Sequence, residues 1–233
     1  MNKLAILGFP RSSTKLLASV HEQNGYFNFG EFFDTFSCDI DATNIPFAKR
    51  YSIEDQFKFR ATRNSSLFAT NYEQHIETKR RIELYKQYAD VMSIITIWPE
   101  NFELAPELFE ILSDRYFLCT RRVNKFEQLL SRVVTHYNLN YNNEVKSKSF
   151  VVELRTFELF YFNLKKVENL QDYIIKSGRG RIVDFDRLIT GNEDLGFPYN
   201  VRTVDQHTNL YDLVLNLDEI SQKFINLNKL FPI

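Results

Sequence analysis

The amino-acid sequence predicts an α/β fold in three layers, with a mostly parallel central sheet flanked by helices. Residues 4–9 (LAILGF) are a short, nearly continuous apolar run without polar alternation, as expected of a strand that is covered on both faces. Residues 92–98 (MSIITIW) are rich in β-branched residues and are closed by Pro99, which predicts a second buried strand. Longer stretches with the apolar spacing of amphipathic helices separate such runs. Because ligands bind at the carboxyl ends of parallel strands, polar residues that follow a predicted strand are the first candidates for a functional site.

Each predicted element depends on a local sequence pattern. The predicted strands are residues 4–9, 26–33, 92–98, 116–120 and 181–185. The predicted helices are residues 15–23, 52–63, 72–89, 106–112, 125–137, 150–176 (one helix or two in succession) and a last helix that ends near 230. Asn124 and Asp218 are the expected N-cap residues of the helix over 125–137 and of the last helix, and Ser177-Gly178 is the expected end of the long one. The expected irregular segments are residues 39–46, 139–149 and 190–198.

Length and composition predict one globular domain over residues 1–233. Hydrophobic residues make up 44% of the chain, including 22 Phe and 12 Tyr, which is ample material for one core. Lys and Arg number 29 against 30 Asp and Glu, and this balance argues against a nucleic-acid partner. Two cysteines without metal-ligand spacing favour a reducing compartment. No run approaches the roughly 18 apolar residues of a membrane span, so we expect a soluble, full-length, cytoplasmic protein.

Residues 8–17 (GFPRSSTKLL) form a polar turn between the first predicted strand and the first predicted helix. The first N–H groups of a helix lack intrahelical partners and carry the positive end of the helix dipole, so this turn suits a phosphate or a sulfate. The side chains that add charge or hydroxyl groups there are Arg11, Ser12, Ser13, Thr14 and Lys15. The turn is not a Walker A sequence, because the pattern counted from Gly8 requires Gly, Lys and Ser/Thr where this chain has Ser13, Thr14 and Lys15. An ordinary capped helix is the alternative interpretation of the turn taken alone.

This turn resembles the 5′-phosphosulfate loop of sulfotransferases that use 3′-phosphoadenosine 5′-phosphosulfate. That loop runs approximately [Lys/Arg]-Ser-Gly-[Ser/Thr]-[Ser/Thr]-x-Leu after a strand, and residues 11–17 (RSSTKLL) match it in order. Ser13 stands where Gly is usual, and Lys15 stands where a hydroxyl residue is usual. The resemblance implies the P-loop-like topology of the family, this donor as cofactor, and adenosine 3′,5′-bisphosphate as product. It also implies a set of residues that bind the donor, namely Arg11, Ser12, Ser13, Thr14 and Lys15.

Glu31 follows the second predicted strand in the sequence Gly30-Glu31-Phe32-Phe33. In carbohydrate-directed and bacterial sulfotransferases a Glu in a similar Glu-Phe-Phe context is the proposed general base, so the resemblance implies that role for Glu31. The chemistry is reasonable, because a carboxylate that takes the proton of a hydroxyl group makes that oxygen a better nucleophile. Taken alone, a Glu beside aromatic residues is more often a solvated residue at a strand end.

A second anion-binding motif follows the predicted strand over residues 116–120. In the resembled family an Arg at a strand end and a Ser on the next helix hold the 3′-phosphate of the donor, and Arg122 with Ser131 fits this pattern. The separation is nine positions from Arg122 and ten from Arg121, against about eight in the family, so either Arg is open as the ligand. A guanidinium can bind a phosphate with two hydrogen bonds. In isolation, two basic residues at a strand end are ordinary surface residues.

Histidines and metal ligands contribute little to the prediction. Only His75 is kept as a reserve base, and no pair of His or Cys residues has metal-ligand spacing, so no metal is expected. The sequence therefore predicts a sulfotransferase that acts on a hydroxyl group of a glycan or a small molecule, with Glu31 and Arg11 as catalytic residues. A nucleoside or nucleotide kinase and a non-catalytic binding module with the same fold are the alternatives. The acceptor and the oligomeric state stay open.

Overall fold

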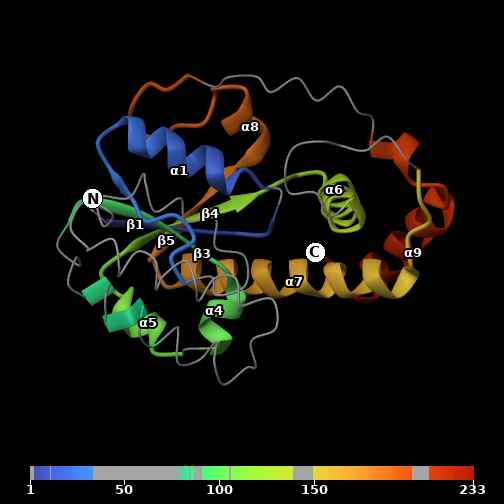
Figure 1. The fold of residues 1–233 in the computed structure, drawn as a ribbon, viewed down its shortest axis with the longest axis horizontal. Helices are drawn as coiled ribbons and strands as arrows, with labels where there is room; N and C mark the ends of the chain where they lie inside the picture. Colours follow the sequence, from blue (N-terminus) through green and yellow to red (C-terminus); the bar gives the residue numbers. More distant parts are fainter. Residues whose placement is uncertain are drawn as a thin grey trace, which may run out of the picture. The chain divides into compact units, whose positions relative to one another are not determined.

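The computed structural model describes residues 3–10, 12–33, 91–104, 106–138, 149–200 and 210–233, together with 79, 81–83, 85 and 86. The fold is α/β, with a five-stranded parallel sheet flanked by helices (Figure 1). The strand order is β2-β3-β1-β4-β5, in which the first strand along the chain lies at the centre. The predicted fold class is confirmed, and this order is consistent with a P-loop-like topology.

The strands are short and their central members are fully covered. Their bounds are β1 (Lys3–Gly8), β2 (Phe27–Asn28), β3 (Ser93–Ile97), β4 (Tyr116–Arg121) and β5 (Gly180–Asp184). In the parallel pair β1 and β3, Ile6 lies opposite Thr96 and Leu7 lies opposite Ile97. Every residue of β3 is buried, including the polar Ser93 and Thr96, which agrees with the predicted buried strand.

The helices lie largely where the sequence predicts them. Their bounds are α1 (Thr14–Gln23), α4 (Pro99–Leu104), α5 (Leu108–Ile111), α6 (Lys125–Asn138), α7 (Leu154–Lys176), α8 (Phe185–Ile189) and α9 (Leu217–Leu230). The predicted N-cap of α6 is confirmed, because the Asn124 side chain accepts a hydrogen bond from the backbone N–H of Glu127 at 3.0 Å. The long predicted helix is one helix, α7, and it is followed by Gly178 with a φ of 74°.

The chain divides into two compact units. Unit 1 comprises Met1–Gly8, Thr14–Cys119 and Gly178–Arg181, and unit 2 comprises Phe9–Ser13, Thr120–Ser177 and Ile182–Ile233. The boundary falls within the turn that follows β1 and within the strands β4 and β5. One domain over residues 1–233 therefore stays a prediction.

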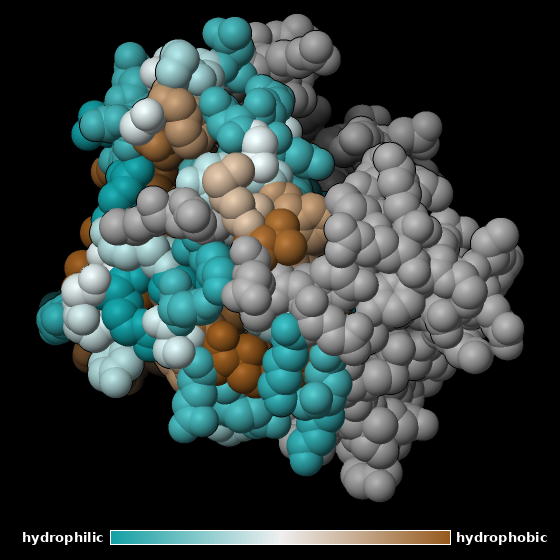
Figure 2. Space-filling view, turned by 90° about the vertical axis from the view of Figure 1, so that its left-hand side faces the viewer, coloured by the Kyte–Doolittle hydropathy of each residue, from teal (hydrophilic) through white to brown (hydrophobic). Residues whose placement is uncertain are grey.

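Unit 1 has a layered core around β1 and β3. Helix α1 covers one face of these strands, and α4 with α5 lies on the opposite face (Figure 1). The buried side chain of Arg115 joins the amino ends of the strands, because its guanidinium donates to the carbonyls of Leu4 (2.7 Å) and Ser93 (3.1 Å). The described atoms in Figure 2 are largely hydrophilic, with hydrophobic residues in separate areas.

Unit 2 has a helical core of its own. Helix α7 packs against α6 and α9, and the 3-10 helix η2 (Leu210–Leu213) contacts α6. The apolar face of α6 supplies Leu129, Leu130, Val133 and Val134 to this core. The side chain of Asn216 joins two distant segments, since it exchanges two hydrogen bonds of 2.9 Å with the backbone of Val152.

Three predictions about elements are wrong. The strand over residues 26–33 is only two residues long, because Phe29, Phe32 and Phe33 are all buried and the chain must bend at Gly30 to bury them. Helix α4 begins at Pro99, a residue predicted only to end the strand before it, although Pro favours the first position of a helix. The N-cap of α9 is Asn216 rather than Asp218, which lies in the first turn.

Some predicted segments cannot be compared with the structure. The irregular segment over 39–46, the helix over 52–63 and the segment 139–148 lie outside the described residues. Of the helix over 72–89, the described positions 79, 81–83, 85 and 86 are helical. Within the described part of the chain, no helix combines the length and the apolar character that crossing a bilayer requires.

Candidate anion-binding site and the Glu31 segment

The side chain of Ser12 stabilises the turn after β1, and this turn belongs to unit 2. Its side chain is fully buried, and its Oγ donates a hydrogen bond of 2.6 Å to the carbonyl of Phe9. The same oxygen lies 2.7 Å from the hydroxyl oxygen of Thr120 near the carboxyl end of β4. This pair of buried hydroxyl groups therefore brings the turn after β1 next to the residues that precede Arg121 and Arg122. Arg11 lies outside the described residues.

Ser13 adopts a backbone conformation that favours glycine. Its φ is +59°, and among the described residues it is the one non-glycine residue with a positive φ. A side chain in this left-handed region costs about 1–2 kcal/mol, because Cβ approaches the following carbonyl oxygen. Ser13 stands where the 5′-phosphosulfate loop of sulfotransferases usually has Gly. The backbone of Ser13 therefore has the conformation that a glycine favours.

Helix α1 begins at Thr14, directly after Ser13. The Thr14 side chain is buried and Lys15 is exposed, both in unit 1. At the start of this ten-residue helix the first backbone N–H groups have no intrahelical acceptor, and the helix dipole places positive charge there. The chain at Ser13 and Thr14 therefore offers N–H donors and a neighbouring cation, which is a suitable arrangement for an anion.

Arg121 and Arg122 have different surroundings at the end of β4. Arg121 is anchored to α7: it donates to the Gln171 side chain at 2.7 Å, to the Glu168 carbonyl at 3.1 Å and to the Asp172 carboxylate at 2.6 Å. These three acceptors occupy both the Nε and an Nη of the guanidinium. Arg121 is therefore a structural link between β4 and α7.

Arg122 is half-buried, and its Nε is a buried donor that is not used. Its side chain is 10% exposed, its guanidinium lies 4.2 Å from the centroid of the Phe185 ring, and its Nη2 donates to Glu127 Oε1 at 2.9 Å. No acceptor among the described residues reaches its buried Nε. A buried donor without a partner is costly, so a ligand acceptor is the natural partner for this group.

Ser131 and Gln128 lie on α6, which follows Arg122. Ser131 is buried, and three positions separate it from Gln128, so both side chains project from one side of the helix. Gln128 is 1% exposed, and its Oε1 has no hydrogen-bond partner among the described residues. Ser12, Ser13, Arg122 and Ser131 thus belong to unit 2, whereas Thr14, Lys15 and Glu31 belong to unit 1.

Glu31 lies at the carboxyl end of β3 in unit 1. The carbonyl of Gly30 accepts a hydrogen bond of 2.8 Å from the N–H of Thr96, and Gly30 has a φ of 62°. The Asn28 side chain accepts from the N–H of Gly30 at 2.8 Å, which stabilises the bend. Glu31 is partly exposed and comes directly after this bend.

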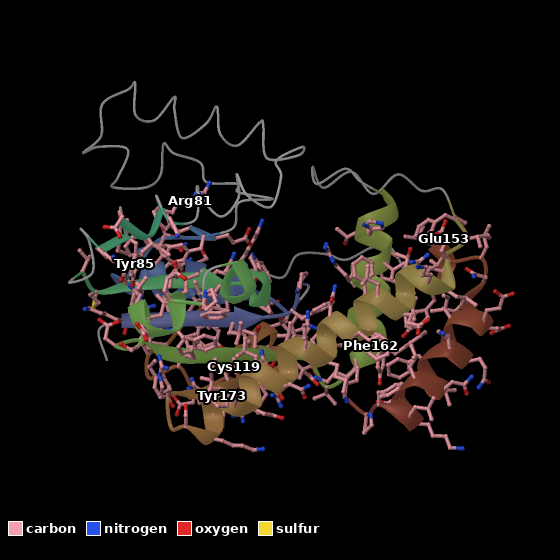
Figure 3. The ribbon with its side chains drawn as sticks, turned by 90° about the horizontal axis from the view of Figure 1, so that it is seen from below. Arg81, Tyr85, Cys119, Glu153, Phe162 and Tyr173 are labelled. Atoms are coloured by element: carbon pink, nitrogen blue, oxygen red, sulfur yellow. The ribbon has the colours of Figure 1, made fainter. Side chains whose placement is uncertain are left out.

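Two buried side chains hold the backbone on the other side of Glu31. Arg81 donates to the carbonyl of Phe32 at 2.8 Å, and Asn101 donates to the carbonyl of Phe33 at 3.0 Å. Figure 3 shows Arg81 and, near it, Tyr85, beside the strands of unit 1. Residues 29–33 are therefore fixed both by their buried aromatic rings and by hydrogen bonds to their carbonyls.

Sequence reasoning missed Thr120, Gln128, Arg81 and Asn101. Thr120 ends a predicted strand, and its polar hydroxyl group at that point is a signal that could have identified it. Gln128 lies within an expected amphipathic helix, and only its complete burial distinguishes it from a surface residue. Arg81 and Asn101 act on carbonyl groups 49 and 68 residues away, which no local pattern reveals.

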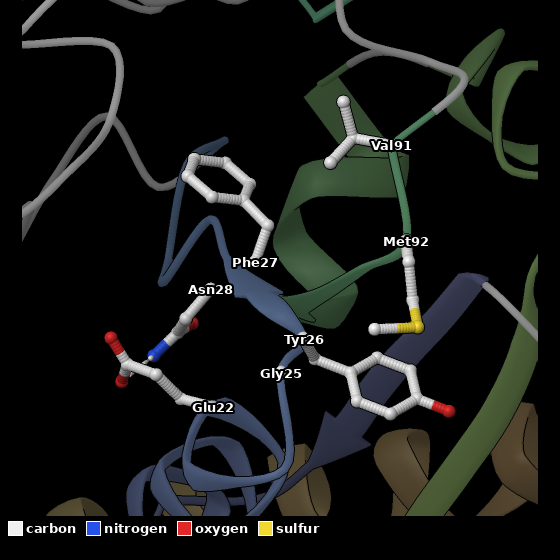
Figure 4. A pocket seen from close by; sticks show the side chains of 7 residues that line it. All are labelled: Glu22, Gly25, Tyr26, Phe27, Asn28, Val91 and Met92. Carbon is white, nitrogen blue, oxygen red and sulfur yellow. Dashed lines mark hydrogen bonds between the residues drawn. The ribbon is translucent and has the colours of Figure 1, made fainter.

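A hollow in unit 1 lies at the opposite ends of the strands. It is lined by Glu22, Gly25, Tyr26, Phe27, Asn28, Val91 and Met92, as Figure 4 shows. Val91 and Met92 precede β3, so the hollow lies at its amino end, whereas ligands of parallel sheets bind at carboxyl ends. Among the described residues no three His, Cys, Asp or Glu side chains are grouped to hold a metal ion, and His75 lies outside these residues.

The described part of the chain thus has a parallel α/β sheet with a polar turn between its central strand and α1. In comparisons with known proteins, no family model matches this chain and no curated protein matches its sequence. The assignment of a function therefore depends on the residues themselves.

Proposed function

We propose that this protein is a sulfotransferase that moves a sulfuryl group from 3′-phosphoadenosine 5′-phosphosulfate to an acceptor hydroxyl group, with a carbohydrate as the first class of acceptor to test. The observation that carries the proposal is the buried Nε of Arg122, which has no acceptor among the described residues at the end of β4. A 3′-phosphate supplies such an acceptor. This phosphate also distinguishes the donor from ATP.

The turn after β1 supports the same proposal. The φ of Ser13 and the start of α1 at Thr14 give the backbone shape and the N–H donors that suit a 5′-phosphosulfate. Lys15 and, from the sequence, Arg11 add positive charge. In the proposed reaction these groups stabilise the negative charge that develops on the phosphate oxygen as the sulfur–oxygen bond breaks.

Glu31 is the proposed general base. Its carboxylate takes the proton of the acceptor hydroxyl group while that oxygen forms a bond to sulfur and the bond from sulfur to the phosphate oxygen breaks. The products are the sulfated acceptor and adenosine 3′,5′-bisphosphate. The hydrogen bonds from Arg81 and Asn101 to the neighbouring carbonyls limit the positions that the Glu31 backbone can adopt, which favours a fixed base.

A thermal-shift experiment tests the nucleotide part of the proposal. The protein is compared in buffer, with adenosine 3′,5′-bisphosphate and with ATP and Mg²⁺, because a ligand at 100 times its Kd stabilises the folded state by about 2.7 kcal/mol. We expect stabilisation by the bisphosphate only. Stabilisation by ATP with Mg²⁺ alone would favour a kinase, and no shift with either nucleotide would reject the proposal.

A transfer assay with labelled donor and a panel of glycans and small hydroxyl compounds tests the chemistry. Glu31→Gln should reduce the rate by about 10²–10⁴-fold while the affinity for the bisphosphate is kept. Glu110→Gln is the matched control, because Glu110 is an exposed residue of α5 away from the Glu31 segment. Full activity of Glu31→Gln would remove Glu31 as the base. Bisphosphate binding without any transfer would favour the non-catalytic binding module.

A further inference from the structure

Helix α6 has a buried polar side in addition to its apolar side. Leu129, Leu130, Val133 and Val134 enter the core of unit 2. Gln128 and Ser131 are on the other side of the helix, and both are buried as well. A polar stripe on a helix is usually solvated, so its burial calls for hydrogen-bond partners.

The side-chain oxygen of Gln128, Oε1, accepts no hydrogen bond from the described residues. Its side chain is 1% exposed, and no donor among the described residues reaches Oε1. Leaving a buried amide oxygen without a hydrogen bond is unfavourable. A ligand or a water molecule that donates a hydrogen bond to this oxygen would therefore be stabilising. An ionised phosphate cannot take this role, because its oxygens only accept hydrogen bonds.

Arg122, six positions before Gln128, has the opposite need, which is an acceptor for its Nε donor. Its Nε donates to nothing among the described residues, and Glu127, the neighbour of Gln128 on α6, accepts from its Nη2. The segment from Arg122 to Gln128 therefore presents one unused buried donor and one unused buried acceptor. A ligand that satisfies both must carry an acceptor oxygen for Arg122 and a hydroxyl or amino group for Gln128.

We propose that Gln128 Oε1 accepts a hydrogen bond from the ribose 2′-hydroxyl group of the nucleotide, next to the 3′-phosphate that Arg122 binds. This inference rests on the proposed function and extends it. On a nucleoside 3′,5′-bisphosphate the 2′-hydroxyl is the donor nearest to the 3′-phosphate, since the two groups are on adjacent ribose carbons. Gln128 is then a residue that determines specificity for ribose over 2′-deoxyribose.

Calorimetry with two ligands and three proteins tests this role. The ligands are adenosine 3′,5′-bisphosphate and its 2′-deoxy analogue, and the proteins are the unmodified chain, Gln128→Met and Thr135→Val. Met has a similar length but no amide. Thr135 lies on the same side of α6 as Ser131, but its hydroxyl group donates to the carbonyl of Ser131 within the helix, so its variant is the matched control.

The unmodified protein should bind the ribose ligand about three- to tenfold more tightly than the deoxy ligand, as expected for one neutral hydrogen bond. Gln128→Met should bind both ligands equally, and Thr135→Val should keep the preference. A preference that persists in Gln128→Met, or equal binding of both ligands by the unmodified protein, overturns the role of Gln128. If Gln128→Met does not fold, Gln128→Asn withdraws the amide by one methylene and should also lose the preference.

The same titrations separate this inference from the proposed function. An unmodified protein that binds neither bisphosphate rejects the sulfotransferase proposal, and the role of Gln128 fails with it. An unmodified protein that binds both bisphosphates with equal affinity rejects only the role of Gln128 and leaves the 3′-phosphate site intact. Loss of all binding in Arg122→Met, with the ribose preference intact in the unmodified protein, supports both.

Discussion

Ser12 and Thr120 are 108 residues apart in the sequence, yet their hydroxyl oxygens lie 2.7 Å apart in the interior of unit 2. The hydrogen bond between them joins the turn after β1 to the end of β4. These are the two places where the sequence predicts anion-binding residues. The pair is therefore the physical link between the two halves of the candidate site that belong to unit 2.

Removing the Ser12 hydroxyl group should weaken both stability and nucleotide binding. Ser12→Ala loses its hydrogen bond to the Phe9 carbonyl and leaves the Thr120 hydroxyl without this partner, so we expect a loss of about 1–3 kcal/mol in the free energy of unfolding in urea. The double variant with Thr120→Val should cost less than the sum of the two single variants. Additive losses would contradict an energetic link between the two hydroxyl groups.

Replacing Ser13 by Gly should stabilise the protein. A glycine accepts the φ of +59° without a Cβ clash, and we expect a gain of about 0.5–1 kcal/mol in urea unfolding after the entropy of glycine is counted. Ser13→Ala is the control, because it removes the hydroxyl group but keeps the Cβ, and it should give no gain. Equal stability of the glycine and alanine variants would show that the backbone at this position is not strained.

Replacing Arg121 should mainly reduce stability, whereas replacing Arg122 should mainly reduce nucleotide affinity. Arg121→Met loses three hydrogen bonds to α7, so we expect a loss of about 2–3 kcal/mol in unfolding free energy. Arg122→Met should lower the affinity for adenosine 3′,5′-bisphosphate, measured by calorimetry, with a smaller loss of stability because its ionic partner Glu127 is partly exposed. The opposite pattern would assign the phosphate to Arg121.

A substitution of Asn101 tests whether the hydrogen bond to Phe33 positions Glu31 for catalysis. Its Oδ1 accepts from the N–H of Trp98 at 2.8 Å, and its Nδ2 donates to the carbonyl of Phe33. Asn101→Asp keeps the acceptor and removes the donor. We expect lower kcat for sulfuryl transfer with unchanged bisphosphate affinity, and a loss of about 1–3 kcal/mol in stability. A variant with reduced stability and unchanged kcat would limit Asn101 to a structural role.

His21 should make stability depend on pH. Burial lowers the pKa of His21 below 6.5, the neighbouring Arg181 adds to this, and the hydrogen bond from Nδ1 to the Leu17 carbonyl opposes it. The folded state therefore binds a proton at His21 less readily than the unfolded state does. Stability from this residue is complete above about pH 6.5 and falls as the pH decreases below that value, by at most about 1.4 kcal/mol per pH unit.

The matching measurement is urea unfolding of the protein and of His21→Gln between pH 5 and pH 8. The difference in unfolding free energy between the two should decrease toward low pH, because only the unmodified protein must desolvate or deprotonate an imidazolium. A difference that grows as the pH falls would mean that His21 is charged in the folded state.

Local patterns were sufficient to predict most elements of the fold. The apolar run before Gly8 and the β-branched run before Trp98 are typical of covered strands. Asn124 indicated the start of α6, because a short polar side chain satisfies the first N–H groups of a helix. The strand predicted over residues 26–33 was wrong because its aromatic residues are buried by a bend, and alternation cannot distinguish a bend from a strand.

The sequence by itself determined the class of fold and the residues that could bind an anion. The tertiary structure decided how those residues are used: Arg121 is anchored by α7, Arg122 keeps a buried donor, and Gln128 is buried with an unused acceptor. Element type depends on neighbours a few positions away, through backbone geometry and the period of apolar residues. Hydrogen-bond satisfaction depends on groups that lie 50 or more residues apart in the chain, as Arg121 and Gln171 do, and these meet only in the folded protein.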